Sequence, residues 1–88
     1  METFLGLPMA MEASRIGGSM PTVFNAANEK AVALFLKKQI RFLDIYKIIR
    51  ESMDTHEVIA NPCLEEILET ERKIYEKIDL KWQQEYFF

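Results

Sequence analysis

The stretch PTVFNAANEKAVALFLKK, residues 21–38, has no glycine, has no proline after Pro21, and is rich in alanine and leucine. Alanine and leucine have high helix propensity, and a proline is tolerated in the first helical turn, where amide donors lack intrahelical partners anyway. The apolar residues of this stretch occupy more than one helical face, which is typical of a helix at the centre of a bundle. We therefore predict a central helix over residues 21–38.

Three further segments with helical periodicity surround this central helix. Apolar residues recur at helical spacing between residues 7 and 16, and Gly17-Gly18 then offers the positive φ that closes many helices. Ser19 is expected to cap the central helix. The four predicted helices span about 7–16, 21–38, 43–53 and 64–81. Because no strand candidate is found, residues 1–88 are predicted to form one all-α domain, a small four-helix bundle.

The composition fits such a domain and argues against several classes of function. The 88 residues are 49% hydrophobic and 28% charged, with a formal net charge of -3 and one cysteine. An acidic chain lacks the positive field that gathers nucleic acid, and the cations Lys37, Lys38 and Arg41 are interpreted as a helix end. A single cysteine fits a reducing compartment. Since no apolar run is long enough to span a bilayer, we expect no membrane partner and a cytoplasmic location.

Two short motifs could carry chemistry, but a structural role is favoured for each. Gly17-Gly18-Ser19 precedes a helix, as phosphate-binding loops do, yet it follows a helix and lacks the lysine of a P-loop. His56 stands near acidic residues, but no second histidine lies at metal-ligand spacing, and Cys63 is seven residues away. Cys63 is interpreted as a helix N-cap, a position where serine would cap better. We assign no catalytic, cofactor-binding or metal-binding residue.

Carboxylates crowd the start of the last predicted helix. Glu65, Glu66, Glu69 and Glu71 are close in sequence, which could suggest a di-metal or glycosidase-like site. Such sites need ligands that face one another from several helices. A solvated acidic face is therefore the favoured interpretation.

The run Asn25-Ala26-Ala27-Asn28-Glu29 is unusual inside a helix. Asparagine has low helix propensity because its side chain competes for backbone hydrogen bonds. Asn25, Asn28 and Glu29 fall near one another at helical spacing of three and four residues. We predict that they form a buried polar clamp that ties the central helix to a neighbouring loop or domain.

Three ordered motifs resemble one enzyme family. The run from Gly17 to Leu36 resembles the GGxxPxxxNAANExAVxxFL pattern of the 1-deoxy-D-xylulose 5-phosphate reductoisomerase family. Residues 40–45 are similar to its I-x-F-x-D-I segment, and residues 64–68 to the LEEIL of its last long helix. The resemblance covers about residues 4–72 and corresponds to roughly the last quarter of that enzyme.

The resemblance implies a parent that converts 1-deoxy-D-xylulose 5-phosphate to 2-C-methyl-D-erythritol 4-phosphate in non-mevalonate isoprenoid biosynthesis. It implies NADPH and a divalent metal, Mg or Mn, both bound by domains that precede this segment and are absent from it. None of the family's metal or substrate motifs occurs here, so the 88-residue chain alone is expected to be inactive and structural. Its partners would be the remaining domains of the parent, in the cytoplasm, or in a plastid for a eukaryotic parent.

Some residues depart from the family pattern, and one alternative function stays open. Cys63 stands where serine is more usual, Glu71 where aspartate is, and the aromatic end Tyr86-Phe87-Phe88 has no clear counterpart. That end is expected to fold back on the bundle or to meet a partner. The alternative function is a free-standing helical interaction module, and the isolated domain is expected to self-associate through its exposed face.

Overall fold

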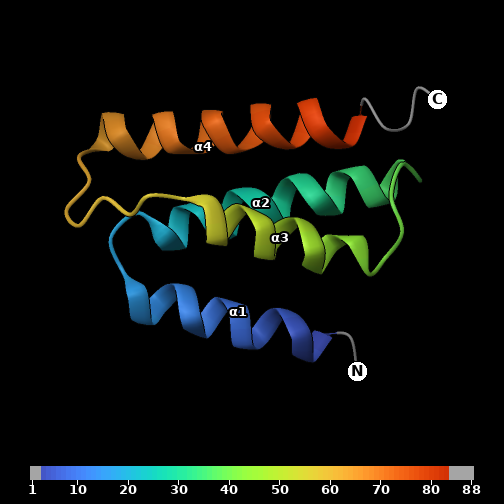
Figure 1. Cartoon of the computed structure of the whole chain (residues 1–88), viewed down its shortest axis with the longest axis horizontal. Coiled ribbons are helices and arrows are strands. Elements are labelled where there is room, and N and C mark those ends of the chain that lie inside the picture. Colours follow the sequence, from blue (N-terminus) through green and yellow to red (C-terminus); the bar gives the residue numbers. More distant parts are fainter. Residues whose placement is uncertain (1–2, 84–88) are drawn as a thin grey trace.

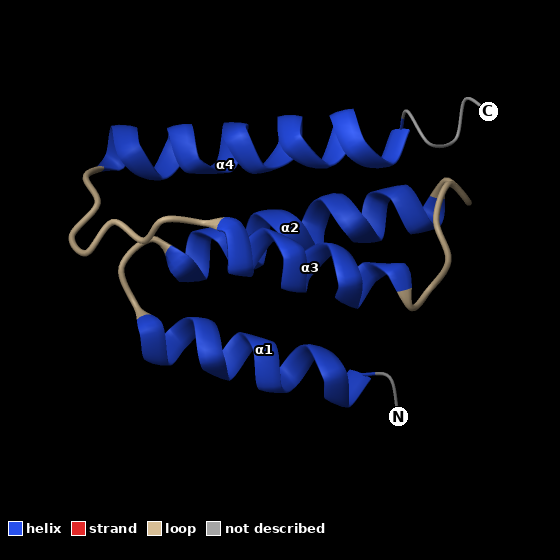
Figure 2. Ribbon diagram, in the orientation of Figure 1, coloured by secondary structure: helices blue, strands red, loops and turns tan. Residues whose placement is uncertain are grey.

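The computed structural model describes the backbone of residues 3–83 and the side chains of residues 8–82. Four α-helices connected by loops make up this part of the chain (Figures 1 and 2), namely α1 Thr3–Ile16, α2 Met20–Leu36, α3 Asp44–Thr55 and α4 Leu64–Ile78, with a terminal π-turn at Asp79–Gln83. No strand occurs among these residues. The predicted all-α bundle is therefore confirmed. The predicted contacts of the aromatic end concern residues outside the described part.

The four helices run up and down the long axis of the bundle, so that successive helices are antiparallel (Figure 1). The helix α2 contacts each of the other three. It buries six residues, and these are mostly small: Met20, Val23, Ala26, Ala27, Ala31 and Leu34. Alanine lets neighbouring helices approach closely, which explains why the helix with the highest propensity lies at the centre.

The helix α3 packs against α2 and contributes large, fully buried side chains to the core. Ile48 and Ile49 are each 1% exposed and are among the largest fully buried side chains. Burying each of them stabilises the fold by roughly 1.5–3 kcal/mol relative to exposure. Ion pairs tie the outer helices to this centre: Arg50 of α3 pairs with Glu12 of α1, and Lys30 of α2 pairs with Asp79 after α4.

The first helix begins earlier than predicted. It starts at Thr3 rather than near residue 7, so that Pro8 lies inside the helix and not in its first turn. A proline within a helix removes its amide donor and crowds the carbonyl four residues earlier, yet α1 is continuous from Thr3 through Pro8. None of the described helices combines the length and apolar character needed to cross a membrane.

The central helix ends earlier than predicted, at Leu36 rather than Lys38. The Lys38 amide donates to the Phe35 carbonyl at 2.9 Å, and the Gln39 amide donates to the Leu34 carbonyl at 2.9 Å. These are the two bonds of a Schellman motif, with Lys38 at φ 62° in the left-handed position that glycine usually fills. No glycine signalled this helix end in the sequence.

The last helix begins where its sequence indicates. Cys63 is the N-cap with extended backbone angles, and its amide donates to the Glu66 carboxylate at 3.0 Å. That bond is one half of a capping box. The predicted stripe to residue 81 continues as the π-turn, which places Trp82 in the core at 8% exposure.

Candidate functional site

The Gly17-Gly18-Ser19 turn is a junction between two connections of the bundle. Ser19 is fully buried, and its amide donates to the Ile59 carbonyl at 2.9 Å. Its hydroxyl accepts the Ile59 amide at 2.8 Å and lies 2.7 Å from Nε2 of His56. Ser19 is the N-cap residue of α2, as predicted, but its side chain binds the α3–α4 connection and makes no capping bond to the helix. Because the Ser19 amide and hydroxyl both bond within the chain, neither is available to bind a phosphate.

Gly18 permits the close approach at this junction. Its φ is +56°, and a Cβ added there would lie 2.3 Å from the Ile59 carbonyl oxygen. Gly17 also has a positive φ, +76°, but a Cβ there would meet nothing within 4 Å. The first glycine is thus needed for its backbone angle alone, whereas the second is needed for the angle and for space.

His56 belongs to this junction. Burial is the main cause that lowers the pKa of its imidazole, and Lys77 and Lys73 of α4 lower it further, while Glu57 opposes them. In the tautomer with an unprotonated Nε2 the ring accepts the Ser19 hydroxyl proton, while the Ser19 oxygen accepts the Ile59 amide. The ring is therefore placed as a structural acceptor.

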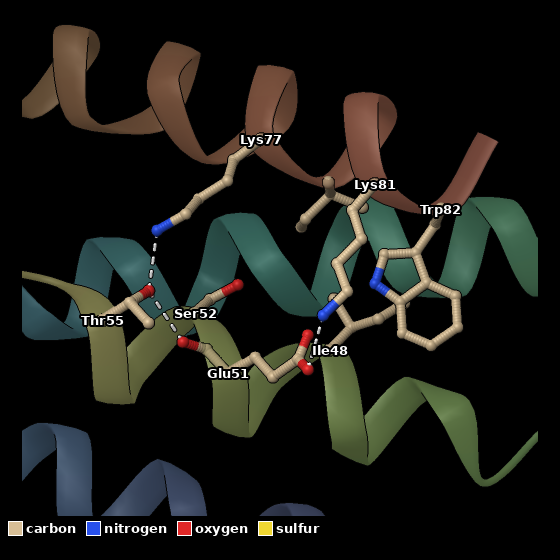
Figure 3. A pocket seen from close by; sticks show the side chains of 8 residues that line it. Ile48, Glu51, Ser52, Thr55, Lys77, Lys81 and Trp82 are labelled. Atoms are coloured by element: carbon tan, nitrogen blue, oxygen red, sulfur yellow. Dashed lines mark hydrogen bonds and ion pairs between the residues drawn. The ribbon is translucent and has the colours of Figure 1, made fainter. Parts of the chain in front are cut away.

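A narrow groove lies between α3 and α4 (Figure 3). Its volume is about 180 Å³, and its lining is mainly apolar. Long side chains bridge it: Lys77 donates to the Thr55 hydroxyl at 2.7 Å, and Lys81 pairs with Glu51 at 2.8 Å. The residues that line it are Ile48, Glu51, Ser52, Thr55, Lys77, Ile78, Lys81 and Trp82.

This groove does not have the size or chemistry of a substrate site. Pockets that hold small molecules usually enclose about 300–1,000 Å³ and present convergent polar groups. Here the polar groups pair with one another across the groove, as the dashed lines in Figure 3 show. The one hydroxyl that meets an amine here, that of Thr55, accepts from Lys77 and donates to the Glu51 carbonyl, so it is already used within the groove.

The carboxylates of α4 do not gather into a site. Glu65, Glu66 and Glu69 are exposed, and Arg72 pairs with both Glu69 and Glu76 along the helix surface. Arg72 lowers the pKa of the Glu69 carboxyl, chiefly through their hydrogen bond. Among residues 8–82 no group of three or more histidine, cysteine, aspartate or glutamate side chains could hold a metal ion.

The three residues of the predicted clamp lie on the outer face of α2. Asn25, Asn28 and Glu29 are all exposed, so burial of the asparagines within the bundle is not observed. The reason is that the small residues one position away, Ala26 and Ala27, face the core. Glu29 accepts a hydrogen bond from the Tyr75 hydroxyl of α4 at 2.5 Å, which raises the pKa of Tyr75 to about 12. Contact of the clamp with another domain stays a prediction.

An apolar surface at the α2–α3 connection was not found from the sequence. We call it the α2–α3 cap and define it by Leu36, Phe42 and Leu43, which are 72%, 39% and 62% exposed. The predicted helices at 21–38 and 43–53 place Leu36 inside one helix and Leu43 at the start of the next. The interruption of helical period at residues 39–42 was the available signal.

Comparison with known proteins identifies the family of the chain. Residues 1–77 match the family described as the DXP reductoisomerase C-terminal domain. The chain belongs to this family. It is 51% identical over 82 residues to a 1-deoxy-D-xylulose 5-phosphate reductoisomerase of Agathobacter rectalis, a match that covers 93% of this chain and 22% of that protein. The resemblance seen in the NAANE run is thereby confirmed.

Other members of this reductoisomerase family show the same extent of similarity. The protein of that name from Thermoanaerobacter pseudethanolicus is 51% identical over 82 residues, 93% of this chain and 22% of its own length. That from Exiguobacterium sp. is 56% identical over 72 residues, 82% of this chain and 19% of its own length. The chain thus spans about a fifth of the relatives it matches. No solved structure matches it significantly.

Proposed function

We propose that this chain is the non-catalytic C-terminal structural domain of a 1-deoxy-D-xylulose 5-phosphate reductoisomerase. The observation that carries the proposal is the match of residues 1–77 to the C-terminal domain family, joined to relatives of which the chain spans only 22%. The parent would convert 1-deoxy-D-xylulose 5-phosphate to 2-C-methyl-D-erythritol 4-phosphate in isoprenoid biosynthesis. Its bacterial relatives and single cysteine support a cytoplasmic setting.

The chemistry of the parent is assigned to the parts of the relatives that this chain does not span. NADPH and a divalent metal, Mg or Mn, would be held there. Supporting this division, several titratable side chains make bonds that hold the bundle together, such as His56 with Ser19 and Glu12 with Arg50. The bundle would serve as a rigid body against which the other domains pack.

The polar clamp is proposed to act between domains. Asn25 and Asn28 stand exposed on α2, where an unpaired asparagine costs helix propensity without return. Glu29 is fixed by Tyr75, so the face that carries the clamp is already ordered. A neighbouring domain that supplied backbone donors and acceptors would pair both amides at little entropic cost.

A chimera tests the proposed function. The 82 matched residues of the A. rectalis reductoisomerase are replaced by the matching residues of this chain. The chimera is expected to convert deoxyxylulose phosphate within about threefold of the parental rate, which corresponds to roughly 0.7 kcal/mol in activation free energy. The same protein truncated before this region is expected to lose at least tenfold. A folded but inactive chimera would contradict the proposal.

A further inference from the structure

We propose that the α2–α3 cap is the surface on which the preceding part of the parent chain docks. The inference rests on the proposed function and names the contact face. The cap lies at one end of the bundle, where α2 ends and α3 begins. It consists of Leu36, Phe42 and Leu43, and all three are substantially exposed.

The exposed side chains of the cap are large and apolar. Leu36 is 72% and Leu43 62% exposed, although Ile40 between them is buried at 5%. Scattered exposed leucines are ordinary on protein surfaces, but apolar residues gathered at one connection favour an interface. At this connection Ile40 is buried in the core, whereas Leu36 and Leu43 face outward.

Contacts with α2 and α3 hold the centre of the cap in place. Phe42 makes edge-to-face contacts with Phe35 of α2 and Tyr46 of α3, with ring centroids 5.4 and 5.8 Å apart. The Arg41 amide donates to the Asp44 carboxylate at 2.9 Å, which fixes the start of α3. The Phe42 ring, already held by these contacts, would lose little conformational entropy when the cap docks.

The position of the cap indicates its occupant. Helix α1 begins at Thr3 at the same end of the bundle as the α2–α3 connection (Figure 1). In the relatives this region is the C-terminal domain and about four fifths of the chain lies outside it. In a parent protein the domain that precedes α1 would connect to the bundle at this end, which also carries the cap.

The charge around the cap indicates the chemistry of the facing surface. Lys37, Lys38 and Arg41 are exposed around the apolar centre, on a chain whose net charge is -3. Interfaces usually place apolar groups at the centre and charges at the rim. The facing surface is therefore expected to be apolar with an acidic rim, which matches a protein domain better than a nucleic acid.

Hydrogen exchange on the chimera tests this assignment. Amides of residues 36–46 are expected to exchange at least tenfold more slowly in the chimera than in the isolated 88-residue chain. Residues 63–68, at the opposite end, are expected to exchange equally in both. An active chimera without added protection at 36–46 would overturn the docking surface and leave the proposed function intact. An inactive, folded chimera would contradict the proposed function itself.

Two matched substitutions sharpen the test. Leu43→Lys and Leu64→Lys each add one cation to the start of a helix, at side chains that are 62% and 69% exposed. In the chimera, Leu43→Lys is expected to remove most of the protection at 36–46, and Leu64→Lys to remove none. Both should melt alike in the isolated chain. Protection at 36–46 that rises with the concentration of the chimera would identify a second copy as the occupant and overturn the proposal.

Discussion

Gly18 is the residue on which the packing of two connections depends. Its backbone lies against the Ile59 carbonyl at a positive φ, so that any side chain would meet both a strained angle and a steric clash. Ser19, next in the chain, then bonds to the amide and carbonyl of Ile59 and to His56. A motif that looks like a phosphate loop in sequence is therefore a contact between loops.

Gly17 and Gly18 provide a matched comparison. Gly17→Ala should cost about 1–2 kcal/mol, because only its left-handed backbone angle opposes a Cβ. Gly18→Ala should cost about 1–3 kcal/mol more, because the Cβ also displaces the α3–α4 connection. Urea denaturation of both variants measures the difference. Equal midpoints would show that the connection yields freely.

Lys38 occupies a backbone conformation that favours glycine. At φ 62° it lies in the left-handed position after α2. Lys38→Gly should therefore raise the free energy of unfolding by about 0.5–1 kcal/mol, after the greater freedom of glycine in the unfolded chain is deducted. Thermal unfolding of the two proteins provides the measurement. A lower melting temperature for the variant would mean that the lysine side chain contributes packing at this turn.

At the scale of elements, the pH dependence of stability should report on the junction between α3, its following loop and α2. Burial lowers the pKa of His56 from its ordinary value near 6.5. The unfolded chain then binds the proton more readily, so stability is complete above pH 6.5 and falls as the pH drops through the folded pKa. His56→Gln should flatten this fall between about pH 7 and 5.

The carboxylates of other elements contribute in a lower pH window. The pKa values of Glu12, Asp44 and Glu69 are lowered from 4.5, 3.8 and 4.5, so their contributions are lost only as the pH falls below these values. Urea midpoints measured from pH 7 to 5 therefore isolate the histidine. If the urea midpoint fell equally with pH in His56→Gln and in the unchanged chain, His56 would not cause the pH dependence.

The helices themselves could be predicted because their signals are local. Alanine and leucine content, the periodic isoleucines and the Cys63 cap each indicate one helix within a few residues. Two helix ends could not be predicted for physical reasons. Lys38 ends α2 without the expected glycine, and Pro8 lies within α1 without ending it.

The contacts of the candidate site were harder to predict than the helices. Ser19 meets His56 across 37 positions of the sequence, and no local spacing records such a contact. The asparagines of α2 illustrate a second difficulty. Periodicity groups Asn25 with Asn28, but whether their face is buried depends on how the other helices pack around α2.

At the scale of the whole molecule, the clamp should act only when the parent surrounds it. In the isolated chain, Asn25→Ala should be neutral or stabilising by up to about 0.5 kcal/mol, because the side chain is exposed and alanine has the higher helix propensity. In the chimera the same change should destabilise by about 1–3 kcal/mol if a neighbouring domain buries the amide. Asn25→Ala should therefore lower the denaturant midpoint of the chimera without lowering that of the isolated chain. A chimera midpoint that does not fall would show that no clamp forms.

We propose that this bundle supplies structure to a reductoisomerase and has no catalytic activity of its own. The test follows the absorbance of NADPH as the purified 88-residue chain is mixed with 1-deoxy-D-xylulose 5-phosphate and Mg²⁺ or Mn²⁺. The chimera provides the positive control. We expect no oxidation above the rate without protein. Turnover by the isolated chain, abolished by heat and proportional to its concentration, would contradict it.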